Sequence, residues 1–245
     1  LSLCQHHRAE QTGKRTTQDA LIRLIEGGLI VSCQSFEGEP IHGEGIMLKM
    51  AESAKWAGAV GLRANEPKNV KEMKDATGLP VIGIWKQEFE GSDVYITPTM
   101  NEVDALMEAG SDIIAIDCTN RLAPTGEKAY DLIRKIKAKY PDALVMADCS
   151  TYEEGANAIK LGADFIGTTL CGYTDYSDQY DGPSFPMIER LCRDFPGKVI
   201  AEGKINTTDE ARRCIELGAL CVVVGGAITR PHLTAQRFVE ALQRK

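Results

Sequence analysis

Polar side chains follow short apolar runs at eight places along this chain, and several of these side chains are ionisable. A buried strand gains no stability from a charge at its end, so we expect the groups to form one functional site if the runs are parallel strands whose ends meet. Any single member could instead be a surface ion-pair partner. The positions are Gln34, Arg63, Lys86, Asp117, Asp148, Thr168 with Thr169, Glu202, and Gly225 with Gly226.

Lys86 is the first candidate for catalysis because it follows the apolar run 81–85. Its amine should leave a buried strand, where partial desolvation and the charge of Arg63 would both lower its pKa. A lysine in that state can take a proton from carbon. Two other roles stay open, a Schiff base with a carbonyl substrate and a plain ion pair with Asp117.

Glu202 is the second candidate for catalysis. It ends the apolar run 198–201 and stands beside the glycine-containing stretch 203–206. A carboxyl group there can donate a proton to a substrate oxygen or accept one from it. Its alternative role is to neutralise Lys86 or Arg63.

A glycine pair, Gly225 and Gly226, leads from the last apolar run straight into a helical pattern. Backbone N–H groups exposed by glycine at a helix start bind anions, and Gly203 in the preceding loop offers a second half of such a phosphate site. Arg230 could add positive charge. The alternative is that the glycines only permit tight turns.

The elements that must position these groups repeat about every 25 to 30 residues as a β-branched apolar run followed by a helical pattern. The runs predict strands buried on both faces. They span residues 28–33, 59–62, 81–85, 112–116, 143–147, 164–167, 198–201 and 220–224. Amphipathic helical stretches lie between them, for example 44–56, 101–108, 151–161 and 208–217.

Several helical stretches end in a glycine, at Gly58, Gly110, Gly162 and Gly218, which predicts left-handed helix caps. Eight such units favour a single (β/α)₈ TIM barrel of the phosphate-binding type, whose site lies at the carboxyl ends of the strands. An open doubly wound sheet is the competing architecture, but no G-x-G-x-x-G follows the first run. The stretch 86–99 departs from the repeat and is a candidate lid or wall.

Composition agrees with one globular domain over residues 1–245, with 43% hydrophobic and 26% charged residues. A net charge of −7 argues against nucleic acid and anionic membranes as partners. No apolar run is long enough to span a bilayer, so we expect a cytoplasmic protein. The eight cysteines are expected to be reduced, and no C-x-x-C or paired Cys/His spacing predicts a metal site.

Seven segments, in order from about residue 21 to the C-terminus, resemble motifs of the N-acetylmannosamine-6-phosphate 2-epimerases. Residues 1–17 match nothing in that family and are expected to be an extension outside the core. The segments are Ile30–Gln34, Ile82–Lys86, Tyr95–Thr99, Ala147–Thr151, Thr168–Thr174, Ala201–Thr207 and Val224–Pro231.

The resemblance implies interconversion of N-acetylmannosamine 6-phosphate and N-acetylglucosamine 6-phosphate in sialic acid breakdown, with no metal or redox cofactor. By position, the family's catalytic lysine and glutamate correspond to Lys86 and Glu202. The resemblance also implies a homo-oligomer, with a dimer as the simplest form. Substrate contacts fall on Gln34, Arg63, Asp148, Lys204 and Arg230, and the phosphate site falls on Gly203, Gly225 and Gly226.

Two alternatives remain from the residues alone. The first is another phosphate-binding barrel enzyme, such as a thiamine phosphate synthase-like transferase or an isomerase of amino-acid biosynthesis. The second is a non-catalytic barrel that senses a phosphosugar, because a fold by itself does not fix activity. The segments around Lys86 and Glu202 count against both.

Overall fold

The computed structural model describes residues 18–243, and within them eight parallel strands close into a barrel with each strand paired to the next in sequence and β8 paired to β1. This closure excludes the open doubly wound sheet. The strands are β1 (Leu29–Cys33), β2 (Gly61–Asn65), β3 (Val81–Ile84), β4 (Ile113–Asp117), β5 (Leu144–Asp148), β6 (Phe165–Gly167), β7 (Val199–Glu202) and β8 (Cys221–Val224).

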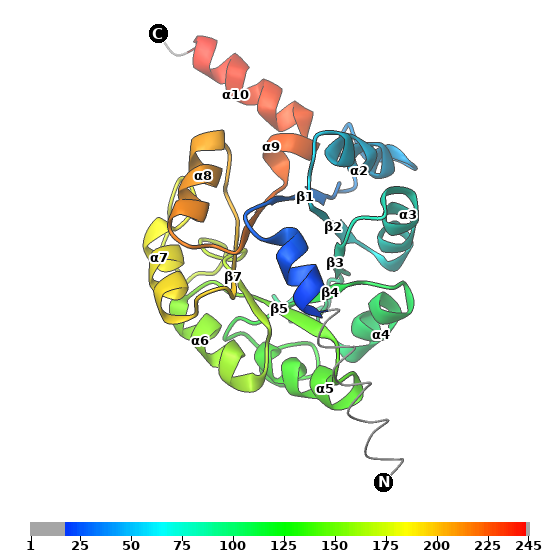
Figure 1. The fold of residues 1–245 in the computed structure, drawn as a ribbon, viewed down its shortest axis with the longest axis vertical. Coiled ribbons are helices and arrows are strands. Elements are labelled where there is room, and N and C mark those ends of the chain that lie inside the picture. The colour runs from blue at the N-terminus through cyan, green and yellow to red at the C-terminus, as the bar shows by residue number, and fades with distance from the viewer. Residues whose placement is uncertain (1–17, 244–245) are drawn as a thin grey trace.

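Helices ring the strands on the outside of the barrel (Figure 1). Residues 18–25 form a further helix ahead of β1. The elements after β1 are α2 (Ile46–Trp56), α3 (Pro67–Thr77), α4 (Met100–Glu108), the short 3₁₀ helix η1 (Ala129–Asp131), α5 (Leu132–Lys139), α6 (Tyr152–Leu161), α7 (Phe185–Asp194), α8 (Thr208–Glu216), α9 (Gly226–Thr229) and α10 (Pro231–Gln243).

Local interactions cap both ends of several helices. Thr99, Thr151 and Thr207 each form a capping box with a glutamate three residues later, which satisfies N–H groups that the first helical turn leaves free. The four glycines predicted as left-handed caps, Gly58, Gly110, Gly162 and Gly218, all have positive φ. These glycine caps determine where each of the four helices ends before the next strand begins.

Two apolar layers hold the barrel together. One lies between strands and outer helices, and the other fills the barrel interior. The helix 18–25 contributes Ile25, with no exposed surface, to the interior layer, together with partly buried Leu21 and Ile22. Ile96 and Leu170 belong to the same layer and also line the cavity described below. Side chains therefore fill the barrel interior, and the barrel opens into a cavity at the carboxyl ends of its strands.

The strand ends differ from the predicted ones in a way that matters for the site. The second strand was expected to end at residue 62, but β2 continues to Asn65, so Arg63 lies inside a strand. Asp117, Asp148 and Glu202 are likewise the last residues of β4, β5 and β7 rather than the first residues after them. Polar residues suggested loops there, but Asp148 and Glu202 both pair with Arg63 across the barrel. Asp117 instead pairs with Thr119 and Arg121 in the loop that follows β4.

The departure from the repeat at residues 86–99 is a small antiparallel excursion over the barrel mouth. Lys86 pairs with Ile96, and the N–H of Thr97 donates to the carbonyl of Trp85 at 3.0 Å. The N–H of Asp117 donates to the carbonyl of Ile96, which ties the excursion to β4. The segment therefore forms a wall of the mouth.

The remaining expectations concern termini, cysteines and membranes. Residues 1–17, expected to be an extension, lie outside the described residues, as does Cys4. The seven cysteines within residues 18–243 are buried and form no disulfide. No helix in the same range is both long and apolar enough to cross a bilayer.

Ile25→Ala should lower the free energy of unfolding by about 2–5 kcal/mol, because a fully buried side chain at the closed end of the barrel leaves a cavity. Urea unfolding followed by circular dichroism measures this. The matched control is Leu24→Ala, whose side chain is 53% exposed in the same helix. A loss for Ile25→Ala no larger than that for the control would show that the helix does not close the barrel.

Candidate active site

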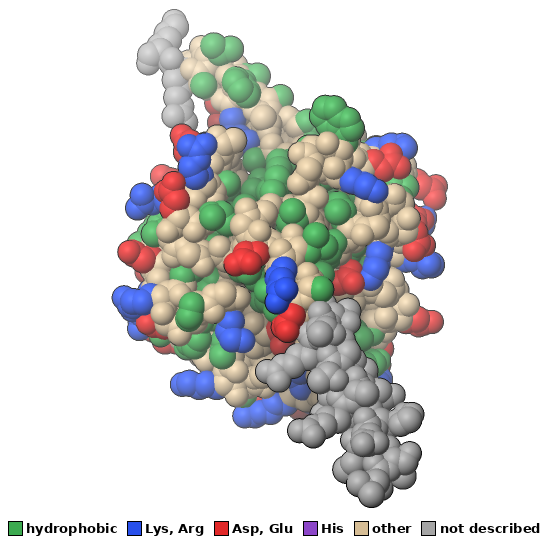
Figure 2. Space-filling model, in the orientation of Figure 1, with side chains coloured by type: hydrophobic (Ala, Val, Ile, Leu, Met, Phe, Trp, Pro, Cys, Tyr) green, Lys and Arg blue, Asp and Glu red, His purple; other side chains and the backbone are tan. Residues whose placement is uncertain are grey.

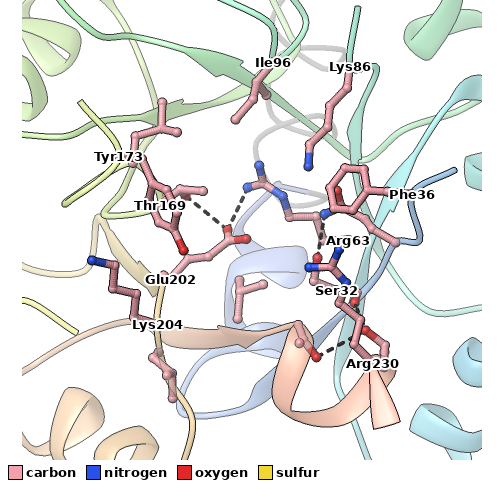
Figure 3. Close-up of a pocket in the computed structure, with 18 of the residues that line it drawn as sticks. Ser32, Phe36, Arg63, Lys86, Ile96, Thr169, Tyr173, Glu202, Lys204 and Arg230 are labelled. Atoms are coloured by element: carbon pink, nitrogen blue, oxygen red, sulfur yellow. Dashed lines mark hydrogen bonds and ion pairs between the residues drawn. The ribbon is translucent and has the colours of Figure 1, made fainter. Parts of the chain in front are cut away.

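A cavity of about 410 Å³ opens at the carboxyl ends of the strands. Nine of the ten residues predicted for the site line it, and Figure 3 shows several of them converging from different strands. Asp148 does not line the cavity but lies directly beneath it. The nine are Gln34, Arg63, Lys86, Glu202, Gly203, Lys204, Gly225, Gly226 and Arg230.

Arg63 is the centre of the site and is only 1% exposed. Its two terminal nitrogens bond both oxygens of Asp148, Nη1 to Oδ1 at 3.1 Å and Nη2 to Oδ2 at 2.6 Å. Nη1 also bonds Oε2 of Glu202 at 2.7 Å. Burial alone would lower the pKa of Arg63, but the charges of Asp148 and Glu202 outweigh it and raise that pKa. The guanidinium therefore stays charged inside the barrel.

Two threonines directly after β6 contact Asp148 and Glu202. The hydroxyl of Thr169 lies 2.6 Å from Oδ1 of Asp148 and 3.2 Å from Oε2 of Glu202. The hydroxyl of Thr168 donates to the carbonyl of Glu202 and accepts from its N–H. Asp148 thus positions Arg63 and Thr169 rather than facing the cavity itself.

Glu202 is a buried carboxyl group with an unusual titration. Burial is the main cause that raises its pKa to about 7; the charge of Arg63 opposes this rise, and the negative charge of Asp148 adds to it. The ion pair with Arg63 agrees with the expected neutralising role. Near neutral pH, however, the group can also carry a proton, which a purely structural ion-pair partner would not need.

Lys86 reaches the cavity from the end of β3. Its N–H donates to Oδ1 of Asn65 at 2.8 Å, and its Nζ lies 4.5 Å from the ring centroid of Phe36 and 5.8 Å from that of Tyr95. Burial, followed by the charge of Arg63, lowers the pKa of Lys86 to about 8. Roughly a tenth of the amine is therefore neutral at pH 7, far more than for an exposed lysine.

The alternative ion pair between Lys86 and Asp117 is wrong. Asp117 bonds Nη2 of Arg121 at 2.7 Å and accepts from the hydroxyl and N–H of Thr119. Lys86 forms no ion pair within residues 18–243. Asp117 therefore fixes the loop after β4, and the amine of Lys86 stays free for a ligand.

The glycines form the opposite side of the cavity. Gly203 has φ +101°, and a Cβ there would lie 3.1 Å from the carbonyl oxygen of Thr169, so other residues would be strained. The N–H groups of Gly226 and Ala227, at the start of α9, have no acceptor among the described residues. Turn geometry thus explains Gly203, while the free N–H groups of α9 suit an anion.

Arg230 lies at the junction of α9 and α10. Pro231 follows it and disfavours helical backbone at the preceding residue. Its Nη2 pairs with Oε1 of Glu39, and its guanidinium carbon lies 4.6 Å from the ring centroid of Phe36. The Nζ of Lys204 donates to the carbonyl of Tyr180 at 2.9 Å.

Sequence patterns did not single out several residues of the site. Ser32 accepts from Nε2 of Gln34 at 2.7 Å, whereas the Oε1 of Gln34 is buried without a donor in the described residues. Inward alternation along β1 could have found Ser32. The other missed residues lie in loops, in the wall of the mouth or at a strand end. No alternation pattern in the sequence marks them, because their position beside the cavity depends on the tertiary fold. The missed residues are Ser32, Phe36, Glu39, Asn65, Tyr95 and Tyr173.

Arg63→Met should lower the free energy of unfolding by about 3–5 kcal/mol, because it leaves Asp148 and Glu202 buried without their cation. Equilibrium unfolding in urea tests this. Lys49→Met removes the exposed ion pair with Glu52 and serves as control, with an expected loss of about 0.5 kcal/mol or less. If the two variants were equally stable, Arg63 would not be the centre of the site.

Comparisons with known proteins identify the family of the chain. A family described as "putative N-acetylmannosamine-6-phosphate epimerase" matches residues 47–244. A relative from Caldanaerobacter subterraneus subsp. tengcongensis, named as a 2-epimerase of the same kind, is 51% identical over 92% of this chain and 95% of its own. A similarly named relative from Clostridioides difficile is 48% identical over 91% of this chain and 99% of its own.

Two solved structures resemble this chain to very different degrees. The N-acetylmannosamine-6-phosphate 2-epimerase from Clostridium perfringens superposes with a TM-score of 0.85 at 45% identity and covers 90% of this chain and 96% of its own. The thiamine phosphate pyrophosphorylase from Pyrococcus furiosus reaches 0.57 at 16% identity over 85% of this chain and 89% of its own, which shows a shared fold alone. The chain therefore belongs to the N-acetylmannosamine-6-phosphate epimerase family.

Proposed function

We propose that this protein is an isomerase that interconverts N-acetylmannosamine 6-phosphate and N-acetylglucosamine 6-phosphate, a step of sialic acid breakdown. One observation carries the proposal. A lysine with a pKa lowered to about 8 and a glutamate with a raised pKa line the same cavity in a member of this family. Both groups can exchange protons near neutral pH, as epimerisation beside a carbonyl requires.

The phosphate of the substrate binds on the glycine side of the cavity. The free N–H groups at the start of α9, with Gly203, Gly225 and Gly226, form a cradle for its oxygens. Arg230 and Lys204 line the same side and supply positive charge. The only other ionisable side chains that line the cavity among the described residues are Arg63, Lys86, Tyr95, Tyr173 and Glu202, so cations outnumber carboxylates and favour an anionic ligand.

The sugar lies between this cradle and Lys86. The Oε1 of Gln34 can accept from a sugar hydroxyl or amide N–H, because it has no donor among the described residues. The Nε–H of Arg63 is likewise buried without an acceptor in that range. The charged guanidinium of Arg63, which lines the cavity, stabilises the developing enolate oxygen, and such a donor typically contributes about 3 kcal/mol to the transition state. Asp148 holds Arg63 in place for this contact.

The reaction proceeds through an open-chain sugar. Glu202 assists ring opening by exchanging protons with the sugar oxygens, which leaves an aldehyde at carbon 1. The neutral amine of Lys86 then removes the proton at carbon 2, and the electrons move onto the carbonyl oxygen to give an enolate. Return of a proton to the other face inverts carbon 2. No oxidation state changes, so the chemistry requires no redox cofactor, and we propose that it requires no metal.

Proton NMR of the protein with N-acetylmannosamine 6-phosphate in heavy water, with chelator present, tests this function. Appearance of N-acetylglucosamine 6-phosphate with deuterium at carbon 2 is the expected result. Bound ligand without conversion would favour a phosphosugar-sensing barrel. Conversion that retains the original hydrogen would rule out proton exchange with solvent as the route.

Lys86→Ala should fold, bind the phosphosugar and lose turnover by about 10²–10⁴-fold, because the group that moves the carbon-bound proton is gone. The same NMR assay gives the rate, and calorimetry gives the binding. Lys68→Ala, which removes an exposed lysine on α3, is the matched control and should keep its rate. Near-normal turnover of Lys86→Ala would remove this lysine from the chemistry.

We further propose that the protein works in the cytoplasm, where charged phosphosugars are retained, and that it is a homodimer. Support for the dimer comes from α10, which points away from the barrel and has no buried residue (Figure 1). Hydrophobic side chains are exposed along it (Figure 2), with Phe238 70%, Val239 51% and Leu242 87% exposed. A second copy that covers this stripe would remove it from water.

Phe238→Asp should shift the sedimentation coefficient from that of a dimer toward that of a monomer, because it places a charge in the apolar stripe. Analytical ultracentrifugation over a range of concentrations measures the shift. Gln236→Asp adds the same charge elsewhere on α10 and should leave the assembly unchanged. Equal sedimentation of both variants and the unchanged protein would place any interface elsewhere.

A further inference from the structure

Two carboxylate oxygens in the site share the same two partners. Oδ1 of Asp148 and Oε2 of Glu202 both contact Nη1 of Arg63, at 3.1 and 2.7 Å. Both also contact Oγ1 of Thr169, at 2.6 and 3.2 Å. Figure 3 shows Thr169 and Arg63 on either side of Glu202. Arg63 offers several hydrogens to this group of atoms, but the hydroxyl of Thr169 offers only one.

The distances decide which carboxylate receives that hydrogen. A separation of 2.6 Å lies in the range of a hydroxyl that donates to a charged carboxylate, and Asp148 is paired with Arg63 through both of its oxygens. The separation of 3.2 Å to Glu202 is longer than an ordinary O–H···O hydrogen bond. The hydroxyl hydrogen therefore lies toward Asp148, and a lone pair of Oγ1 faces Glu202.

We infer that Thr169 is a positioning residue that keeps a proton on Glu202, by offering that proton an acceptor whose own hydrogen is committed to Asp148. If Glu202 were ionised, a lone pair of its Oε2 would face a lone pair of Oγ1 of Thr169, and the two would repel each other. A protonated Glu202 instead donates to Oγ1. The inference rests on the proposed function, in which Glu202 exchanges protons with sugar oxygens.

The other charges around Glu202 do not fix this preference. Burial and the charge of Asp148 favour the protonated form, whereas the charges of Arg63 and Lys86 favour the ionised form. Cys221 on β8 and Tyr173 after β6 are uncharged neighbours in the ordinary pH range. The Oε1 of Glu202 has no partner among the described residues, so it stays available to a substrate while Oε2 is held.

Carbon-13 NMR tests the inference without turnover. The side-chain carboxyl carbons of glutamate are labelled in the whole protein, the signal lost in Glu202→Gln identifies Glu202, and its chemical shift is followed against pH. We expect Thr169→Val, which keeps the shape but lacks the hydroxyl, to lower the titration midpoint of Glu202 by about one pH unit. Thr169→Ser should restore it.

Thr168→Val is the matched control, because its hydroxyl contacts the backbone of Glu202 and not the carboxyl group. Its midpoint should match that of the unchanged protein. A midpoint that rises in Thr169→Val would show that the hydroxyl donates to Glu202 instead, and an unchanged midpoint would remove Thr169 from its titration. Either result overturns the inference, whereas failure of epimerisation in heavy water would overturn the proposed function alone.

Discussion

A guanidinium group in the interior of a closed barrel has no water to solvate it, so it must be neutralised by neighbouring side chains. In this protein Arg63 extends from β2, and the compensating carboxylates, Asp148 and Glu202, come from β5 and β7 on the other side of the barrel. The ion pairs therefore join strands that are distant in sequence. The rest of the site is arranged around this buried charge.

The two carboxylates have different surroundings, and their roles differ accordingly. Asp148 has no exposed surface and gives both oxygens to Arg63, so it acts on the cavity through its neighbours. Glu202 is held through one oxygen and keeps the other free. Burial raises its pKa and lowers that of Lys86, which brings an acid and an amine closer in proton affinity. Proton exchange with a sugar becomes feasible near neutral pH.

The glycine side of the cavity is built differently, from backbone rather than buried charge. Free N–H groups at the start of α9 and the left-handed turn at Gly203 can surround an anion with little rearrangement. Arg230 is tied to Glu39 and stacked on Phe36, so the loop after β1 and the end of α9 meet at this side. In the function that we propose, one half of the site positions the ligand, and the other half moves protons.

The sequence by itself determined the repeating strand and helix units, the glycine caps and the barrel, because local periodicity and turn chemistry specify them. It also identified nine residues that line the cavity, because the strand ends of a barrel converge. Only the tertiary structure placed Arg63 inside β2 and paired it with Asp148 and Glu202. It also brought Phe36 and Tyr95 beside Lys86. Such contacts depend on which side chains share a low-dielectric space across the barrel, and no local pattern encodes that.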